Sequence, residues 1–187
     1  MASHSGAVTD LGTPGTQDIE GLLDADDQCV ADTVDRWVKR HLEALREEAQ
    51  AMQVLFETQL QAAGKGRSRS EWGRVTLRVR EQPSPPATPG SFTLEWCTYR
   101  YANHGGTRTC FTKYLPRGEG DRYPMRAFQG HLRNWQRPIV AAAEARFATI
   151  RRAVRQIAHV RTQLRLAVRT ERAVVQGLRE VGDDWIG

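Results

Sequence analysis

Apolar residues recur at helical spacing in two long segments of the chain. From residue 29 to 63 they return every three or four positions, which is typical of an amphipathic helix. From 138 to 179 the same spacing has heptad character, and Pro138 suits the first turn of a helix. A small sheet cannot cover so long a helix. We therefore predict that the two segments pack against each other as an antiparallel hairpin.

The period changes to two in the middle of the chain. In residues 72–81 aliphatic and basic side chains alternate, with Val75, Leu77 and Val79 on one face and Arg74, Arg78 and Arg80 on the other. This alternation predicts a half-buried strand with a basic outer face. Residues 91–101 and 107–115 are rich in threonine and aromatic residues and flank a turn-forming stretch at 103–106. Residues 72–115 are therefore predicted to form a β-meander of three strands.

These elements predict an α+β fold in one domain over residues 29–187. It consists of a long, coiled-coil-like antiparallel helical hairpin with a small three-stranded antiparallel β-sheet inserted between the helices. Residues 1–28 are acidic, and their first half is rich in small residues, so we expect this segment to be disordered or weakly ordered. No apolar run is long enough for a secretory signal or a membrane span, and three unpaired cysteines suit a reducing compartment. We expect a cytoplasmic protein.

Charge divides sharply along the sequence. Residues 1–63 hold four basic and twelve acidic residues, whereas 64–187 hold 23 basic and ten acidic ones. Acids on the first helix could pair with arginines beside the seam of the second, namely Arg151, Arg155, Arg165, Arg169 and Arg172. That pairing does not reach residues 65–137, where fourteen basic residues face five acidic ones. The sheet and its loops therefore carry the uncompensated charge.

Nearly all of this basic charge is arginine, whose planar fork of donors matches phosphate oxygens. A GC-rich genome would also enrich arginine, but would not explain where the arginines lie. From residue 113 to 126 basic residues, glycines and tyrosines interleave, as is common on nucleic-acid surfaces. We predict DNA contacts by Arg74, Arg78, Arg80, Lys113, Arg117, Arg122, Tyr123, Arg126 and Arg133.

Several aromatic residues have an alternative interpretation. Residues 113–126 could form an ordinary connecting loop in which Tyr123 packs against Phe128 or Trp135. Trp96 is expected in the core with Phe92 and Leu94, because the three alternate along one strand. Tyr99 and Tyr101 fall on the opposite face and are the better candidates for a surface that stacks on bases.

Catalytic motifs are not evident in the sequence. No HExxH pair, nucleophile elbow or carboxylate–histidine grouping appears. Cys97 and Cys110 could be diagonal neighbours in a hairpin, but two thiols without histidine partners make a poor metal site, so solitary buried cysteines are expected. We predict a protein that is not an enzyme and has no cofactor or metal.

The order of these features resembles a known family. A helix, the tryptophan-bearing strand Phe92–Trp96, a hairpin, the segment Gly118–Phe128, Trp135 and a long helix containing Glu144–Arg151 together resemble MobI-type auxiliary proteins of conjugative plasmids and integrative conjugative elements. The similarity covers about residues 30–165. The N-terminal segment and the proline-rich loop at 83–90 have no counterpart.

The resemblance implies a non-enzymatic accessory factor that binds DNA at or near the origin of transfer and assists a relaxase. The most family-like segment contains Lys113, Arg117, Arg122, Tyr123 and Arg126, whose assignment as DNA contacts rests on charge. The alternative is a coiled-coil adaptor or scaffold that binds a protein partner or self-associates as a homo-oligomer. Arg161 and Glu171, which interrupt the apolar seam, could then set its register.

Overall fold

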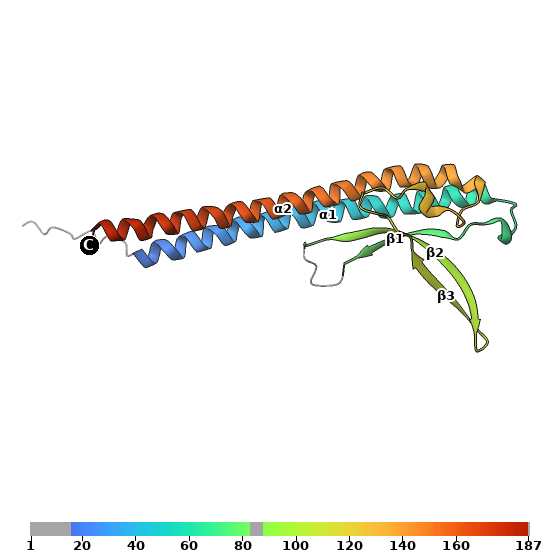
Figure 1. Ribbon diagram of the computed structural model, residues 1–187, viewed down its shortest axis with the longest axis horizontal. Helices are drawn as coiled ribbons and strands as arrows, with labels where there is room; N and C mark the ends of the chain where they lie inside the picture. The colour runs from blue at the N-terminus through green and yellow to red at the C-terminus, as the bar shows by residue number, and fades with distance from the viewer. Residues whose placement is uncertain (1–15, 83–87, 187) are drawn as a thin grey trace, which may run out of the picture.

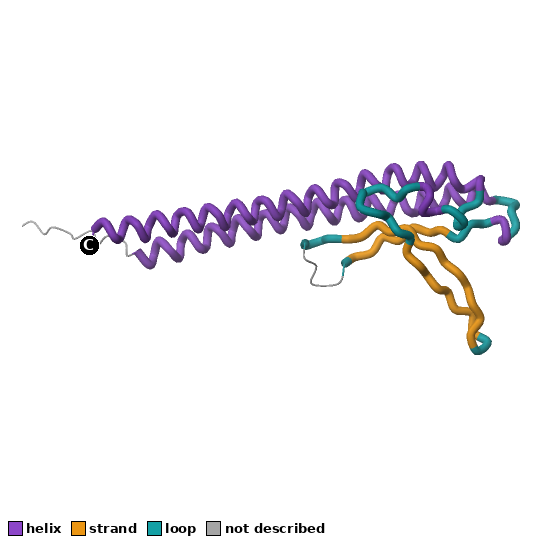
Figure 2. The backbone as a smooth tube through the Cα atoms, viewed as in Figure 1, coloured by secondary structure: helices purple, strands orange, loops and turns teal. Residues whose placement is uncertain are grey.

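Two long antiparallel helices dominate the computed structural model, which describes residues 16–82 and 88–186 (Figures 1 and 2). α1 comprises Thr16–Gly64 and α2 comprises Arg137–Ile186. The helices contact each other, and a three-stranded antiparallel sheet lies between them in the chain. The predicted α+β hairpin with an inserted sheet is confirmed. Within the described ranges, no helix is both long and apolar enough to cross a membrane.

Both helices extend beyond their predicted ends. α1 begins at Thr16 rather than at residue 29, so the structure describes residues 16–28 as helix within the segment that we expected to be disordered or weakly ordered. Ile19, Leu22 and Leu23 continue the helical spacing upstream, and a polar stretch at 24–28 hides that continuity in the sequence. α2 continues to Ile186 rather than ending at 179. Residues 1–15 lie outside the described part of the chain.

The sheet has the order β1-β2-β3, with β1 at Val75–Glu81, β2 at Phe92–His104 and β3 at Thr107–Tyr114. β1 pairs with the first half of β2 and β3 with the second half, so the two partners overlap only near Cys97. Beyond that point β2 and β3 form a two-stranded projection that points away from the helices, here called the β2–β3 arm (residues 99–112; Figure 1). Every residue of β3 is exposed.

Trp96 of β2 lies at the centre of the core and is fully buried. The rings of Phe56 from α1, Phe128 from the short helix η2 (Met125–Phe128) and Phe147 from α2 meet it edge-on, with ring centroids 5.2, 5.3 and 6.1 Å away. Edge-on aromatic pairs add stabilisation beyond their buried area. The predicted core positions of Trp96, Phe92 and Leu94 are confirmed.

The connections at the closed end of the hairpin are fixed by close packing. The indole rings of Trp72 and Trp135 meet edge-on, with centroids 5.1 Å apart. The side-chain oxygen of buried Gln136 accepts hydrogen bonds from the N–H groups of Gly73 (2.8 Å) and Arg133 (3.0 Å). These contacts hold the segment that leads into β1 against the segment that leads into α2.

One acidic residue of α1 pairs with two arginines of α2 across the hairpin. Asp35 accepts hydrogen bonds from Arg161 (2.8 and 3.2 Å) and Arg165 (2.6 Å). The predicted pairing between helices is therefore confirmed for Arg165. It is wrong for Arg151 and Arg155, whose carboxylate partners lie on α2 itself and on the loop before it.

Candidate nucleic-acid interface

A buried carboxylate organises the segment before α2. Glu144 accepts hydrogen bonds from the indole N–H of Trp96 (2.6 Å) and the backbone N–H of Tyr123 (2.7 Å). It also receives a bidentate pair of hydrogen bonds from Arg151 (2.7 and 2.9 Å), and both side chains are buried. Arg151 donates further to the backbone oxygens of Leu94 (3.1 Å) and Asp121. Each of these two buried charges therefore has a partner of opposite charge and further hydrogen bonds, as a buried ion pair requires.

This network fixes the basic loop, defined here as residues 116–124. Asp121 adds an ion pair with Arg155 of α2 at 2.7 Å. The side chains of Arg117 and Arg122 remain exposed on the loop, and Arg126 is exposed on η2 directly after it. The loop therefore presents its arginines to solvent from a backbone that is tied to the core.

Tyr123 is a correction to the predicted site. Only 4% of its surface is exposed, and its ring lies between Phe128, 6.2 Å away, and the Arg151 guanidinium, 4.8 Å from the ring centroid. Burial raises the pKa of its hydroxyl. Tyr123 therefore packs in the core, as the alternative interpretation held, and cannot stack on a base from this position.

Three predicted arginines share the face of the sheet that points away from Trp96. This outer face consists of residues 74, 76, 78 and 80 beside and on β1, the odd-numbered residues 93–101 of β2, and Arg108, Cys110, Thr112 and Tyr114 of β3. The side chains of Arg74, Arg78 and Arg80 are exposed there. Arg80 donates a hydrogen bond of 2.9 Å to the Tyr114 hydroxyl, which crosses from β1 to β3 and raises the pKa of Arg80.

The outer face carries an excess of positive charge. Its one acidic residue is Glu95, opposite Arg78 in the strand register. Four arginines, Arg74, Arg78, Arg80 and Arg108, lie on the same face, and the sequence has no acid between Glu95 and Glu119. Among the residues whose side chains the structure describes, no carboxylate forms an ion pair with Arg74, Arg78, Arg80, Arg100, Arg108, Lys113, Arg117, Arg122 or Arg126. Such arginines are available to phosphate oxygens.

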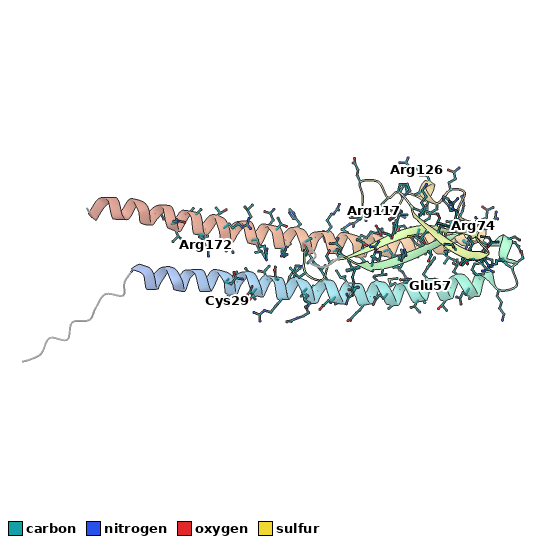
Figure 3. All side chains as sticks on the ribbon, turned by 90° about the horizontal axis from the view of Figure 1, so that it is seen from below. Cys29, Glu57, Arg74, Arg117, Arg126 and Arg172 are labelled. Carbon is teal, nitrogen blue, oxygen red and sulfur yellow. The ribbon has the colours of Figure 1, made fainter. Side chains whose placement is uncertain are left out.

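The predicted residues do not form one patch. Lys113 pairs with Thr98 and points to the face opposite Arg74, and Arg133 lies at the closed end, where it donates to the backbone oxygen of Ser70 (2.8 Å). Figure 3 shows Arg117 and Arg126 along the α2 side and Arg74 nearer the closed end. The structure brings together Arg74, Arg78 and Arg80 on the sheet, and Arg117, Arg122 and Arg126 on and beside the basic loop.

Sequence reasoning missed several residues that shape this surface. Glu144 holds the basic loop, a role that neither its place in the family-like stretch Glu144–Arg151 nor its helical spacing between apolar Val140 and Phe147 revealed. Arg108 stacks on Tyr101, with 4.2 Å from guanidinium carbon to ring centroid, and its position follows from the register of the β2–β3 arm. Tyr99 is half-buried and Tyr101 exposed, and both lie on the face opposite Trp96 as expected.

The cysteines differ from expectation. Cys97 is buried, but Cys29 and Cys110 are exposed, so only one of the three is a solitary buried thiol. Cys97 pairs with Tyr114 and Cys110 with Tyr101 in the strand register, which separates the two thiols along the ladder. Burial raises the pKa of Cys97 to about 11. Among the described residues, no group of three potential metal ligands occurs.

The chain matches a protein-family model described as MobI protein, over residues 45–165. This range contains the C-terminal part of α1 (residues 45–64), the whole sheet, the basic loop and the first half of α2. Comparison with curated proteins and with solved structures found no match. The chain therefore belongs to the MobI family, and membership implies an accessory role in mobilization by conjugation.

Proposed function

We propose that this protein binds DNA at or near the origin of transfer and assists the relaxase there as a non-enzymatic factor. The observation that supports this most directly is the group of exposed arginines on the outer face, Arg74, Arg78 and Arg80, without a carboxylate ion-pair partner among the described residues. MobI membership supplies the conjugative context. The relaxase would perform the strand chemistry, and this protein would bind and position the DNA.

Phosphate contacts would dominate the affinity of such a surface. Each arginine that neutralises a phosphate releases condensed counterions, so affinity falls steeply as the salt concentration rises. The anchored basic loop favours binding further, because Arg117 and Arg122 extend from a backbone that Glu144 and Asp121 already hold. Little conformational entropy of that backbone is then lost on binding.

A gel-shift titration on origin-region DNA at two salt concentrations tests the proposal. We expect a complex at low salt that weakens strongly at higher salt. Arg74→Glu with Arg78→Glu should weaken binding far more than Arg40→Glu with Arg169→Glu, a matched charge change at exposed positions on the two helices. No complex at low salt, or equal effects of the two double variants, would reject the proposed interface.

A second candidate function is supported by the part of the hairpin far from the sheet. There, apolar side chains of α2 are exposed, namely Val160, Leu164, Leu166, Val174, Val175 and Leu178. A groove of about 270 Å³ between the helices is lined by apolar Val30, Val34, Leu164 and Val168, with Arg165, Arg169 and Arg172 beside them. Contiguous exposed apolar surface often marks a protein interface. This end is suited to an adaptor that binds a protein partner or a second copy of the chain.

Sedimentation of the purified protein separates the two candidates. A monomer that binds DNA supports the first function alone. A stable homo-oligomer or a complex with a relaxase, without DNA affinity at low salt, supports the adaptor. Leu164→Glu should dissociate such an assembly, while Arg78→Glu should leave it intact, because these residues lie on the two different surfaces.

A further inference from the structure

A hollow of about 580 Å³ lies between the segment that leads into β1 and the β2–β3 arm. We call it the tyrosine cleft. Its lining includes Arg67, Arg69, Arg74, Tyr99, Tyr101 and Arg108, and it contains no carboxylate. The volume is within the range of pockets that hold small organic groups. Four arginines and two tyrosines thus surround one concave space.

The tyrosines form an aromatic wall of this cleft. The rings of Tyr99 and Tyr101 meet edge-on with centroids 5.9 Å apart, and the Arg108 guanidinium lies 4.2 Å from the centroid of Tyr101. Burial raises the pKa of Tyr99, and Arg69 and Arg74 line the same hollow as its ring. The wall therefore combines ring faces with cationic groups at close range.

The arginines of the cleft are available to an anion. Across the described residues, Arg69, Arg74 and Arg108 have no carboxylate ion-pair partner. Arg67 stacks on Trp135 at 5.1 Å and forms a long ion pair with Glu71, with 3.9 Å between its Nη1 atom and the Glu71 Oε1 atom. A stacked guanidinium keeps its N–H donors in the plane of the group, where they can bind phosphate in bidentate fashion.

A concave site with aromatic and cationic walls fits an unpaired nucleotide better than a duplex. In a duplex the base faces are stacked on one another, so only phosphates and base edges are accessible from outside. Aromatic side chains that bind DNA through ring stacking need bases outside a paired stack. Phosphate binding alone would need arginines and would not need the tyrosine wall.

We propose that the tyrosine cleft binds unpaired nucleotides of a DNA single strand. A base would stack on Tyr99 or Tyr101, and the flanking phosphates would be held by Arg69, Arg74 and Arg108. This inference rests on the proposed DNA-binding function and extends it. The outer face would bind phosphates of any DNA, and the cleft would add a preference for an unpaired strand.

Fluorescence anisotropy with a labelled single strand and a labelled duplex of the same sequence tests this directly. Tyr99→Leu with Tyr101→Leu should weaken single-strand binding by about tenfold or more, since each stacked base contributes substantially to affinity. Duplex affinity should change by less than about twofold, because phosphate contacts are retained. The conservative pair Tyr99→Phe with Tyr101→Phe keeps both rings and should bind the single strand like the unmodified protein.

Phe111→Leu is the matched aromatic control. Phe111 lies on the opposite face of the same β2–β3 arm, beside Arg100, with 5.6 Å from guanidinium carbon to ring centroid. Its replacement should leave both affinities unchanged. Arg69→Gln provides a second variant that leaves the aromatic packing intact, and it should weaken single-strand binding more than Arg126→Gln does.

The outcomes separate this inference from the proposed function. If the double leucine variant loses affinity equally for the single strand and the duplex, or loses none, the cleft does not bind unpaired nucleotides. Duplex binding by the outer face would still stand. A free mononucleotide that competes as strongly as the single strand would also overturn it, since the ligand would then be a nucleotide. If neither probe binds at low salt, both the inference and the proposed function fall.

Discussion

Glu144 and Arg151 form a buried, bidentate ion pair within α2, with 2.7 Å between the Arg151 Nη2 and Glu144 Oε2 atoms. The two residues lie two turns apart on one face of the helix. Through Trp96 and Tyr123 the pair joins β2 and the basic loop to α2. This buried ion pair therefore anchors the surface that carries the exposed arginines.

Removal of one partner from this pair should be strongly destabilising. We expect Glu144→Ala or Arg151→Ala to lower the free energy of unfolding by about 3–5 kcal/mol, because each leaves a buried, uncompensated charge. The double variant should cost clearly less than the sum of the two single ones. Urea unfolding followed by circular dichroism measures all three. Additive losses, or a loss no larger than that of exposed Glu47→Ala, would contradict the assigned role.

Asp35 should make stability depend on pH. Its hydrogen bond from Arg161, together with the charges of Arg161 and Arg165, holds the pKa of this carboxyl below its ordinary value despite the opposing effect of burial. A lowered folded-state pKa means that the ionised form stabilises the fold above about pH 4 and that this contribution is lost as the pH falls through the folded pKa. Asp35→Asn should cost about 1 kcal/mol at pH 7.

The difference in stability between the Asp35→Asn variant and the unmodified protein should be smaller in acid. Thermal unfolding of both proteins at pH 7 and at pH 3 would measure it. Asp32→Asn is the control, since the side chain of Asp32 is exposed and accepts a hydrogen bond of 2.8 Å from Gln28 on the same helix. If the Asp35→Asn variant is less stable than the unmodified protein by the same amount at both pH values, the charge of Asp35 does not support the pairing of the helices.

Gly73 should tolerate no side chain. A Cβ there would lie 2.2 Å from the Gln136 side-chain oxygen and 2.4 Å from the backbone oxygen of His131. Gly73→Ala should therefore destabilise the protein by about 1–3 kcal/mol through overpacking. Gly177→Ala, in the exposed part of α2 with open space around it, should instead be neutral or stabilising by up to about 1 kcal/mol. Thermal unfolding of the two variants measures these effects. Similar melting temperatures for Gly73→Ala and Gly177→Ala would contradict the packing described at the closed end of the hairpin.

The three thiols should differ in reactivity. At pH 8 Cys97 is buried and almost wholly protonated, because burial raises its pKa to about 11, whereas Cys29 and Cys110 are exposed. A thiol reagent that reports thiolate by absorbance should therefore react quickly with two groups per chain and with the third only after denaturation. Rapid reaction of all three in the folded protein would show that β2 opens readily near Cys97.

Periodicity along the chain was sufficient to predict much of the fold. Steps of three and four gave the two helices, and alternation from Val75 to Arg80 gave a strand with a basic outer face. The start of α1 was missed because polar residues 24–28 interrupt the apolar spacing. The β2–β3 arm was not foreseen, because it arises from the register in which β1 pairs only with the first half of β2.

The candidate site was less predictable, since it depends on contacts between distant segments. Charge identified exposed Arg74, Arg78 and Arg122 correctly as surface residues. It could not tell that Tyr123, in the same loop as Arg122, faces the core, because that orientation is set by Glu144 from α2. The tyrosine cleft likewise joins residues 67–74 to residues 99–108, which no local pattern relates.

The outer-face arginines are proposed to bind DNA phosphates. The most direct measurement is the salt dependence of the dissociation constant for origin-region DNA, compared between the unmodified protein and Arg74→Gln with Arg78→Gln. We expect weaker binding and a log–log salt slope reduced in magnitude by about 1 for each phosphate contact removed. An unchanged slope and affinity in the double variant would show that these arginines do not contact the DNA.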